Sequence, residues 1–268
     1  MKIIRDEEHR EILFVERDPT VKLSKRSQKV LNELQEAGYS EEQLQNRGLI
    51  VMFHGKNGRK EDLLPVAERY ITAGFSCLLV DLPAHGESPI EETKYVERLD
   101  EMVLSVAKKH IDINNQPIYF WGISLGGRYA ILSSAHHDKR IFPESKALVL
   151  LSTFDNFSYI LKEKSVNLFG NHLGQALYQG LAFSLNLFYD FDPKKIDSAT
   201  LVKSINIPIF MLHGEQDELI SYRHGQNLFN QFPTKAKEFH LDTNGDHHNI
   251  LVTEYPFYLK SILFLLEH

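Results

Sequence analysis

The sequence predicts an α/β fold, a doubly wound and mostly parallel sheet with a helical cap insertion. Short continuous runs of apolar residues recur along the chain, and segments with helical periodicity separate them. Continuous apolar runs are typical of strands that helices cover on both faces, because a strand with one solvated face alternates apolar and polar residues. Reactive polar residues follow several of these runs, and active sites lie at the carboxyl ends of such parallel strands.

Composition limits the functional classes. The chain has 268 residues, of which 43% are hydrophobic and 25% charged, and this suits one large globular domain. The net charge of −6 argues against nucleic acid as a partner. The single cysteine, Cys77, allows no intramolecular disulfide and favours a reducing compartment. Because the N-terminus lacks a signal-peptide core and no run reaches the ~18 apolar residues of a membrane span, we expect a cytoplasmic protein without stable membrane insertion.

Residues 1–48 are predicted to form an N-terminal extension with a strand pair and a helix. The strands are expected at 11–16 and 20–24. The helix follows from apolar residues at helical spacing, and Gly38 stands where a left-handed C-terminal cap falls. The spaced residues are Val30, Leu31, Leu34 and Ala37.

The predicted core comprises residues 49–151 and 207–268. Strands are expected at 49–53, 76–81, 117–123, 147–151, 207–212 and 237–241, and helices at 62–73, 94–110 and 254–265. This alternation indicates a parallel sheet with helices on both faces.

The segment Gly122-Ile-Ser124-Leu-Gly126 joins one of these strands to a helix. A strand that turns sharply into a helix holds the residue at the turn in strained backbone geometry, so its neighbours must be small. Gly122 and Gly126 meet this requirement. The turn presents a hydroxyl above the sheet edge, beside helix N–H groups that favour developing negative charge. Ser124 is therefore the candidate nucleophile.

A serine nucleophile needs a base that takes its proton and a carboxylate that orients the base. Asp217 follows the strand expected at 207–212, and the adjacent His247 and His248 follow the strand expected at 237–241. The chain order of serine, acid and histidine is the one expected for a sheet of this kind.

With these residues in place, the sequence resembles the α/β-hydrolase superfamily, in particular its esterase- and lipase-like serine hydrolases with a helical cap. The resemblance covers residues 49–265. It is carried by His54-Gly55 after the first core strand, the turn Asp81-Leu-Pro-Ala-His85-Gly86, the elbow at Ser124 and the segment His213-Gly-Glu-Gln-Asp217.

The resemblance implies a role for each matching residue. Ser124, Asp217 and His248 form a catalytic triad, and the backbone N–H groups of Lys56 and Leu125 form an oxyanion hole. Apart from the resemblance, we expect four other polar residues after the strands to fix turns by hydrogen bonding. These residues are Asp81, His85, His54 and His213.

Two of these assignments have alternatives. The spacing Gly-x-x-His from Gly245, with asparagine next, favours His248 over His247 as the base. Some relatives place the acid after the preceding strand, where this chain has Asp155. We assign Asp155 to the cap of a helix instead.

Residues 152–206 form the predicted helical cap, because roughly fifty residues exceed a normal crossover between strands. Leu173, Leu177, Leu181 and Leu185 recur at four-residue spacing, which predicts a helix. Since an apolar stripe usually packs, we expect most of these side chains to be buried against the domain, with an apolar pocket left over Ser124.

The sequence thus predicts a serine hydrolase that cleaves carboxylic esters of small or medium apolar acyl substrates through an acyl-enzyme at Ser124. We expect neither a cofactor nor a metal, because the chain has no Gly-x-Gly-x-x-Gly, no His-Glu-x-x-His and no zinc-type Cys/His spacing. Thioester or amide cleavage by the same triad is an alternative. A ligand-binding protein without turnover is another, which the intact triad disfavours.

Overall fold

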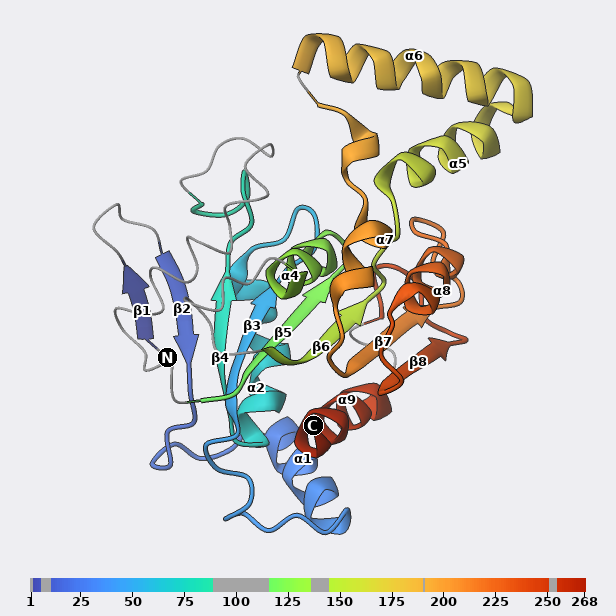
Figure 1. Ribbon diagram of the computed structural model, residues 1–268. Coiled ribbons are helices and arrows are strands. Elements are labelled where there is room, and N and C mark those ends of the chain that lie inside the picture. The colour runs from blue at the N-terminus through green and yellow to red at the C-terminus, as the bar shows by residue number, and fades with distance from the viewer. Residues whose placement is uncertain (1, 6–10, 89–115, 136–144, 190, 251–254) are drawn as a thin grey trace.

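The computed structural model describes residues 2–5, 11–88, 116–135, 145–189, 191–250 and 255–268. Its centre is an eight-stranded sheet with the strand order β1-β2-β4-β3-β5-β6-β7-β8 (Figure 1). β1 pairs antiparallel with β2 and β2 antiparallel with β4, whereas the other pairs are parallel. The predicted α/β class with a mostly parallel sheet is confirmed.

The strands are β1 (Lys2–Arg5), β2 (Glu11–Val15), β3 (Gly48–Phe53), β4 (Phe75–Val80), β5 (Ile118–Ile123), β6 (Ser145–Leu151), β7 (Ile209–Gly214) and β8 (Lys237–Asp242). The α-helices are α1 (Lys25–Glu36), α2 (Leu64–Thr72), α4 (Leu125–Ala135), α5 (Phe157–Phe169), α6 (Asn171–Tyr189), α7 (Ser198–Leu201), α8 (Tyr222–Gln231) and α9 (Tyr255–Glu267). The core strands expected from the sequence lie within two residues of observed ones. The helix expected at 94–110 lies outside the described residues.

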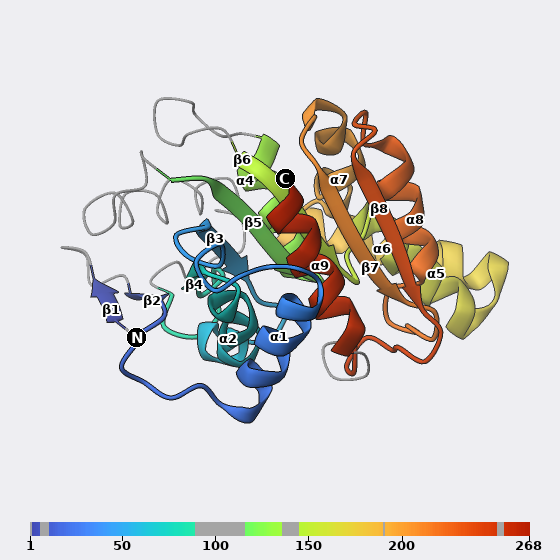
Figure 2. The ribbon, with the colours of Figure 1, turned by 90° about the horizontal axis from the view of Figure 1, so that it is seen from below.

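Two apolar layers attach the helices to the sheet. α1, α2 and α9 cover one face, where Leu34, Tyr70 and Ile262 pack into a common core (Figures 1 and 2). α4 and α8 cover the other face through Ile131 and Leu228. Because both faces are covered, every residue of β3 and β5 is buried, and these strands are continuous apolar runs in the sequence.

The N-terminal extension differs from the expectation in one strand. β2 is the strand expected at 11–16, but its antiparallel partner is β1 rather than residues 20–24. In this second segment, Thr20 donates its N–H and its hydroxyl to the carboxylate of Asp18, at 2.9 and 2.6 Å, and Ser24 caps α1. Such local bonds to side chains compete with strand pairing, and this physical effect made the prediction wrong.

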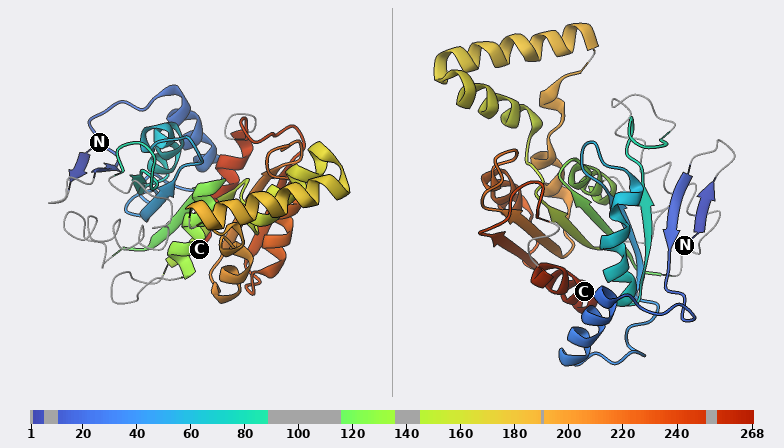
Figure 3. Two further views of the ribbon diagram at one scale, coloured as in Figure 1. Left: turned by 90° about the horizontal axis from the view of Figure 1, so that it is seen from above. Right: turned by 180° about the vertical axis from the view of Figure 1, so that it is seen from behind.

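α5 and α6 form a helical hairpin between β6 and β7. It stands away from the sheet on the side of the carboxyl ends (Figures 1 and 3). α6 packs mainly against α5, where a Cβ on Gly174 would lie 2.4 Å from the carbonyl oxygen of Ser165. The expectation that the apolar stripe is buried against the domain is wrong, because Leu173, Leu177 and Leu181 are exposed by 56%, 44% and 43%. The hairpin turns this stripe outward.

Candidate active site

Ser124 lies in a tight turn between β5 and α4. Its φ of 54° is a left-handed conformation in which a serine is strained. Its N–H donates to the carbonyl oxygen of Leu151 at 2.8 Å, and its own carbonyl oxygen accepts from Thr153 Oγ1 at 3.0 Å. Bonds from the end of β6 therefore hold the strained residue in place, as the elbow predicted from the sequence requires.

Two glycines allow this turn to close. A Cβ on Gly122 would stand 2.3 Å from the carbonyl oxygen of Gly126, and a Cβ on Gly126 would stand 2.1 Å from that of Phe53. Neither position has room for a side chain, which confirms that the neighbours of Ser124 must be small. The same close packing brings the loop after β3 to the elbow, since a Cβ on Gly55 would lie 3.5 Å from Ser124 Cβ.

The two residues expected to form the oxyanion hole lie in the loop after β3 and at the start of α4. Lys56 stands in the turn after Gly55, with its side chain exposed, and Leu125 is the first residue of α4. Because the first N–H groups of a helix have no partner within it, the N–H of Leu125 belongs to a set that favours negative charge.

His54 fixes the loop that carries Lys56. Its Nδ1–H donates to the carbonyl oxygen of Gly55 at 2.7 Å, while its Nε2 accepts the N–H of Leu82 at 3.0 Å. Burial lowers the pKa of His54, so the ring stays neutral and can keep both bonds. His85 likewise donates to the carbonyl oxygen of Pro83 at 2.8 Å. Both histidines fix turns, as expected.

Lys60, which the sequence did not single out, forms a buried ion pair with Asp81. Its Nζ lies 2.8 Å from one carboxylate oxygen, its N–H donates to the other at 2.8 Å, and the N–H of Glu87 also donates to Asp81, at 3.0 Å. Burial alone would lower the pKa of Lys60, but the hydrogen bond and charge of Asp81 outweigh it and raise that pKa. The pair ties the loops after β3 and β4 together.

Replacing Lys60 by methionine is expected to lower the free energy of unfolding by about 3–5 kcal/mol, because Asp81 is then left charged, buried and without its cation. Urea unfolding measures the change. Lys22→Met, on an exposed side chain, is the matched control and should shift stability by less than ~0.5 kcal/mol. A Lys60→Met protein as stable as this control would contradict the role assigned to the pair.

Asp217 lies in the loop after β7 with its carboxylate fully enclosed. One oxygen accepts the N–H groups of Leu219 and Ile220, at 3.0 and 2.7 Å, and the other faces His247 Nδ1 at 2.8 Å and His213 Nε2 at 3.5 Å. Burial would raise the pKa of Asp217, but the hydrogen bonds from His213, His247 and Ile220 outweigh it and hold that pKa well below its ordinary value. The carboxylate therefore stays ionised.

The structure pairs Asp217 with His247, not with His248. His248 is exposed, and its N–H donates to the side chain of Asp246 at 2.7 Å. Asn249 closes the same turn, because its N–H also donates to Asp246, at 2.8 Å, and its side-chain oxygen accepts the N–H of Asp246. This doubly bonded turn directs the first histidine inward, so the choice of His248 from the Gly-x-x-His spacing disagrees with the geometry.

Two backbone hydrogen bonds hold the acid loop against the histidine loop. The N–H of Glu215 donates to the carbonyl oxygen of Asp242 at 2.8 Å, and the N–H of Gln216 donates to that of Gly245 at 3.0 Å. These contacts fix the end of β7 beside the end of β8 and thereby set the position of Asp217.

Asp155, the alternative acid, has a different partner. Its Oδ1 lies 2.6 Å from Nδ1 of His224 in α8, and the other ring nitrogen lies 2.9 Å from Oε2 of Glu163 in α5. Burial would lower the pKa of His224, but the bonds and charges of the two carboxylates outweigh it and raise that pKa. The cap of α5 is Asn156, whose side chain accepts the N–H of Ser158 at 2.9 Å, so the helix-cap role expected for Asp155 is wrong.

These contacts attach the helical hairpin to the core. The cationic ring of His224 joins α8 to Glu163 on α5, and Lys164 of the same helix donates to the carbonyl oxygen of Glu218, the residue after Asp217. Sequence reasoning missed this attachment because its groups are more than 50 residues apart along the chain.

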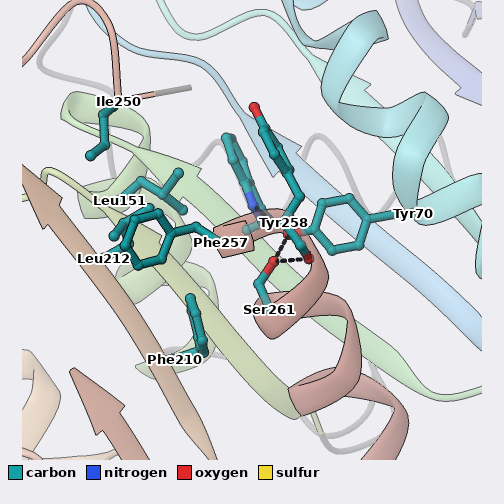
Figure 4. Close-up of a pocket in the computed structure, with 9 residues that line it drawn as sticks. Tyr70, Leu151, Phe210, Leu212, Ile250, Phe257, Tyr258 and Ser261 are labelled. Atoms are coloured by element: carbon teal, nitrogen blue, oxygen red, sulfur yellow. Dashed lines mark hydrogen bonds between the residues drawn. The ribbon is translucent and has the colours of Figure 1, made fainter. Parts of the chain in front are cut away.

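A closely packed core lies between the sheet and the helices α2 and α9 (Figure 4). Trp121 Nε1–H donates to the hydroxyl of Tyr70 at 3.1 Å, and that hydroxyl bonds Ser261 Oγ at 2.8 Å. The cavity among these side chains measures about 10 Å³, about the room that one water molecule needs. Ile250, three residues after His247, lines the same cavity and anchors the histidine loop.

Among the residues that the structure describes, no group of three or more histidine, cysteine, aspartate or glutamate side chains could hold a metal ion. Every described helix is too short or too polar to cross a membrane.

Comparison with known proteins agrees with this architecture. A family model described as serine aminopeptidase, S33, matches residues 44–179, just over half of the chain. An uncharacterized 31.7 kDa protein in the traX-finO intergenic region of Escherichia coli is 23% identical over 241 residues, covering 75% of this chain and 84% of its own.

Solved structures show the same fold. The esterase Pf2001 of Pyrococcus furiosus superimposes with a TM-score of 0.64 at 18% identity, covering 99% of this chain and 89% of its own. Est1E from Butyrivibrio proteoclasticus, solved with ferulic acid bound, gives 0.63 at 18% identity, covering 100% and 98%. The resemblance to the α/β-hydrolase superfamily is thus confirmed, and the chain belongs to the S33 serine aminopeptidase family of serine hydrolases with this fold.

Proposed function

We propose that this protein is a serine hydrolase that cleaves carboxylic esters of small or medium apolar acyl groups through an acyl-enzyme at Ser124. The observation that carries the proposal is the Asp217–His247 pair, with 2.8 Å between carboxylate oxygen and Nδ1, in loops at the same sheet edge as the strained serine. A buried carboxylate that hydrogen-bonds Nδ1 leaves Nε2 of the ring for the nucleophile.

Catalysis proceeds in two halves. Nε2 of neutral His247 accepts the proton of Ser124 Oγ while Oγ bonds to the acyl carbon and the carbonyl electron pair moves to oxygen. The N–H groups of Lys56 and Leu125 stabilise that oxyanion, and Asp217 stabilises the imidazolium. His247 then gives its proton to the leaving alcohol oxygen as the ester bond breaks. Water repeats the sequence on the acyl-enzyme and releases the acid.

An ester is favoured as the substrate because Pf2001, one of the solved neighbours named above, is an esterase. We assign residues 152–206 as the cap. Its side chains Phe154 and Ile160 pack in a cluster that Leu125 joins, so they, and not the outward stripe of α6, are the apolar groups we assign to the acyl side of Ser124. The family description as serine aminopeptidase favours amide cleavage as a second candidate, since the same triad attacks either carbonyl.

A ladder of p-nitrophenyl esters, from acetate to long acyl chains, tests the proposal against matched p-nitroanilides. We expect the esters to be hydrolysed with saturation kinetics, with the highest kcat/KM at a short or medium chain, as the proposed substrate class requires. If the protein hydrolysed the anilides but not the esters, the proposed activity would be amide cleavage and not ester cleavage. If the protein hydrolysed neither the esters nor the anilides, the proposal would be contradicted.

A further inference from the structure

One face of α6 is apolar and exposed along the whole helix. Its large side chains lie 43–72% exposed. They are Leu173, Leu177, Leu181, Phe183, Leu187 and Phe188. Helical spacing puts the polar residues His172, Gln179 and Asn186 along another side. Since α5 is packed against a third side, nothing in the hairpin itself covers the apolar face.

The same helix carries no formal charge. Its nineteen residues, Asn171–Tyr189, include no aspartate, glutamate, lysine or arginine. Two copies of this face can therefore meet without like-charge repulsion, even though each chain has a net charge of −6. A helix that lies on a lipid surface usually has lysine and arginine on its polar face, so the composition disfavours an anionic membrane as the occupant.

The area suits a protein interface. A buried aromatic side chain covers about 150–250 Å². With two phenylalanines and four smaller leucines, each 43–72% exposed, the face offers on the order of 600 Å². Leu168 and Phe169, exposed by 74% and 53% at the tip of the hairpin, add to it. The sum approaches the ~800 Å² that each partner buries in a standard interface, and it exceeds the scattered exposure of a monomer surface.

The position of the hairpin leaves room for a second chain. α6 stands clear of the sheet, and the hairpin extends beyond the rest of the molecule (Figures 1 and 3). A two-fold axis is the commonest symmetry of homo-oligomers, and it places the same patch on both sides of the contact. Gly180, the middle residue of α6, lies on the apolar face, where a Cβ would meet no atom within 4 Å.

We propose that the apolar face of α6 binds α6 of a second copy of this chain, so that the protein is a two-fold dimer whose hairpins pair antiparallel around Gly180. The dimer is independent of the proposed hydrolytic function. Each large apolar side chain of the face then loses its contact with water, which supplies the free energy of association.

Sedimentation velocity of the wild type and of Leu177→Glu/Leu181→Glu tests the dimer. The wild type should sediment at twice 31.0 kDa and the double variant at 31.0 kDa, because it buries two uncompensated carboxylates in the interface. Gln179→Glu/Asn186→Glu, which adds the same two charges to the polar side of α6, should stay dimeric. Far-UV circular dichroism checks that all three are folded.

Cross-linking gives a second measurement of the dimer, and it does not depend on a substitution that disrupts the interface. Since the one native cysteine, Cys77, is buried, Gly180→Cys supplies the accessible thiol. Mild oxidation should yield a covalent dimer for Gly180→Cys and far less for Gln179→Cys. A monomeric wild type, or equal cross-linking of the two variants, would overturn the proposal. A monomer that binds phosphatidylcholine vesicles would instead identify a lipid surface as the occupant.

Discussion

Ser124→Ala should lower kcat/KM for the preferred p-nitrophenyl ester by roughly 10⁴- to 10⁶-fold, because no other hydroxyl occupies the elbow and the acyl-enzyme cannot form. The residual rate reflects stabilisation of the oxyanion by N–H groups that the substitution leaves intact. Progress curves at high enzyme concentration measure it.

Ser152 provides a matched control for this variant. It follows β6 as Ser124 follows β5, it is also left-handed with a φ of 42°, and it is fully buried. Ser152→Ala should keep wild-type kinetics, which separates the chemical role of Ser124 from the effect of altering a strained serine. If Ser124→Ala kept more than about a hundredth of the wild-type rate, the nucleophile would have to be sought elsewhere.

His247→Ala should lower kcat by about 10⁴-fold, whereas His248→Ala should leave it within about threefold of the wild type. The reason is the hydrogen bond that Asp217 makes to the first ring and not to the second. The two variants remove the same side chain from adjacent positions, so each serves as the control for the other. If His248→Ala lowered kcat more than His247→Ala, His248 would be the base, as the sequence spacing favours.

The elbow and the acid loop could be predicted because short-range physics determines them. The glycines around Ser124 are required by contacts within one strand–turn–helix unit, and Asp217 stands directly after an unmistakable apolar strand. The choice between His247 and His248 depends on how Asp246 and its neighbours bond the turn, which the residue order alone does not determine.

Contacts between distant segments that no motif links could not be predicted. Lys60 and Asp81 are 21 residues apart, and Asp155 and His224 are 69 apart, with no spacing that links them. The stripe on α6 has a related explanation. Amphipathic periodicity predicts that a helix has an apolar face, but only the tertiary structure determines whether that face meets the core or points outward.

The two histidine sites of this molecule require opposite protonation states. His247 can act as a base only as a neutral ring, whereas His224 bridges Asp155 and Glu163 as a cation. Because its pKa is raised on folding, the stabilisation from His224 is complete below the ordinary histidine value and disappears as the pH rises through the folded value. Acid therefore strengthens the attachment of α5 to the core, and alkali weakens it. The charge on one buried ring thus decides how firmly the helical hairpin is attached to the sheet.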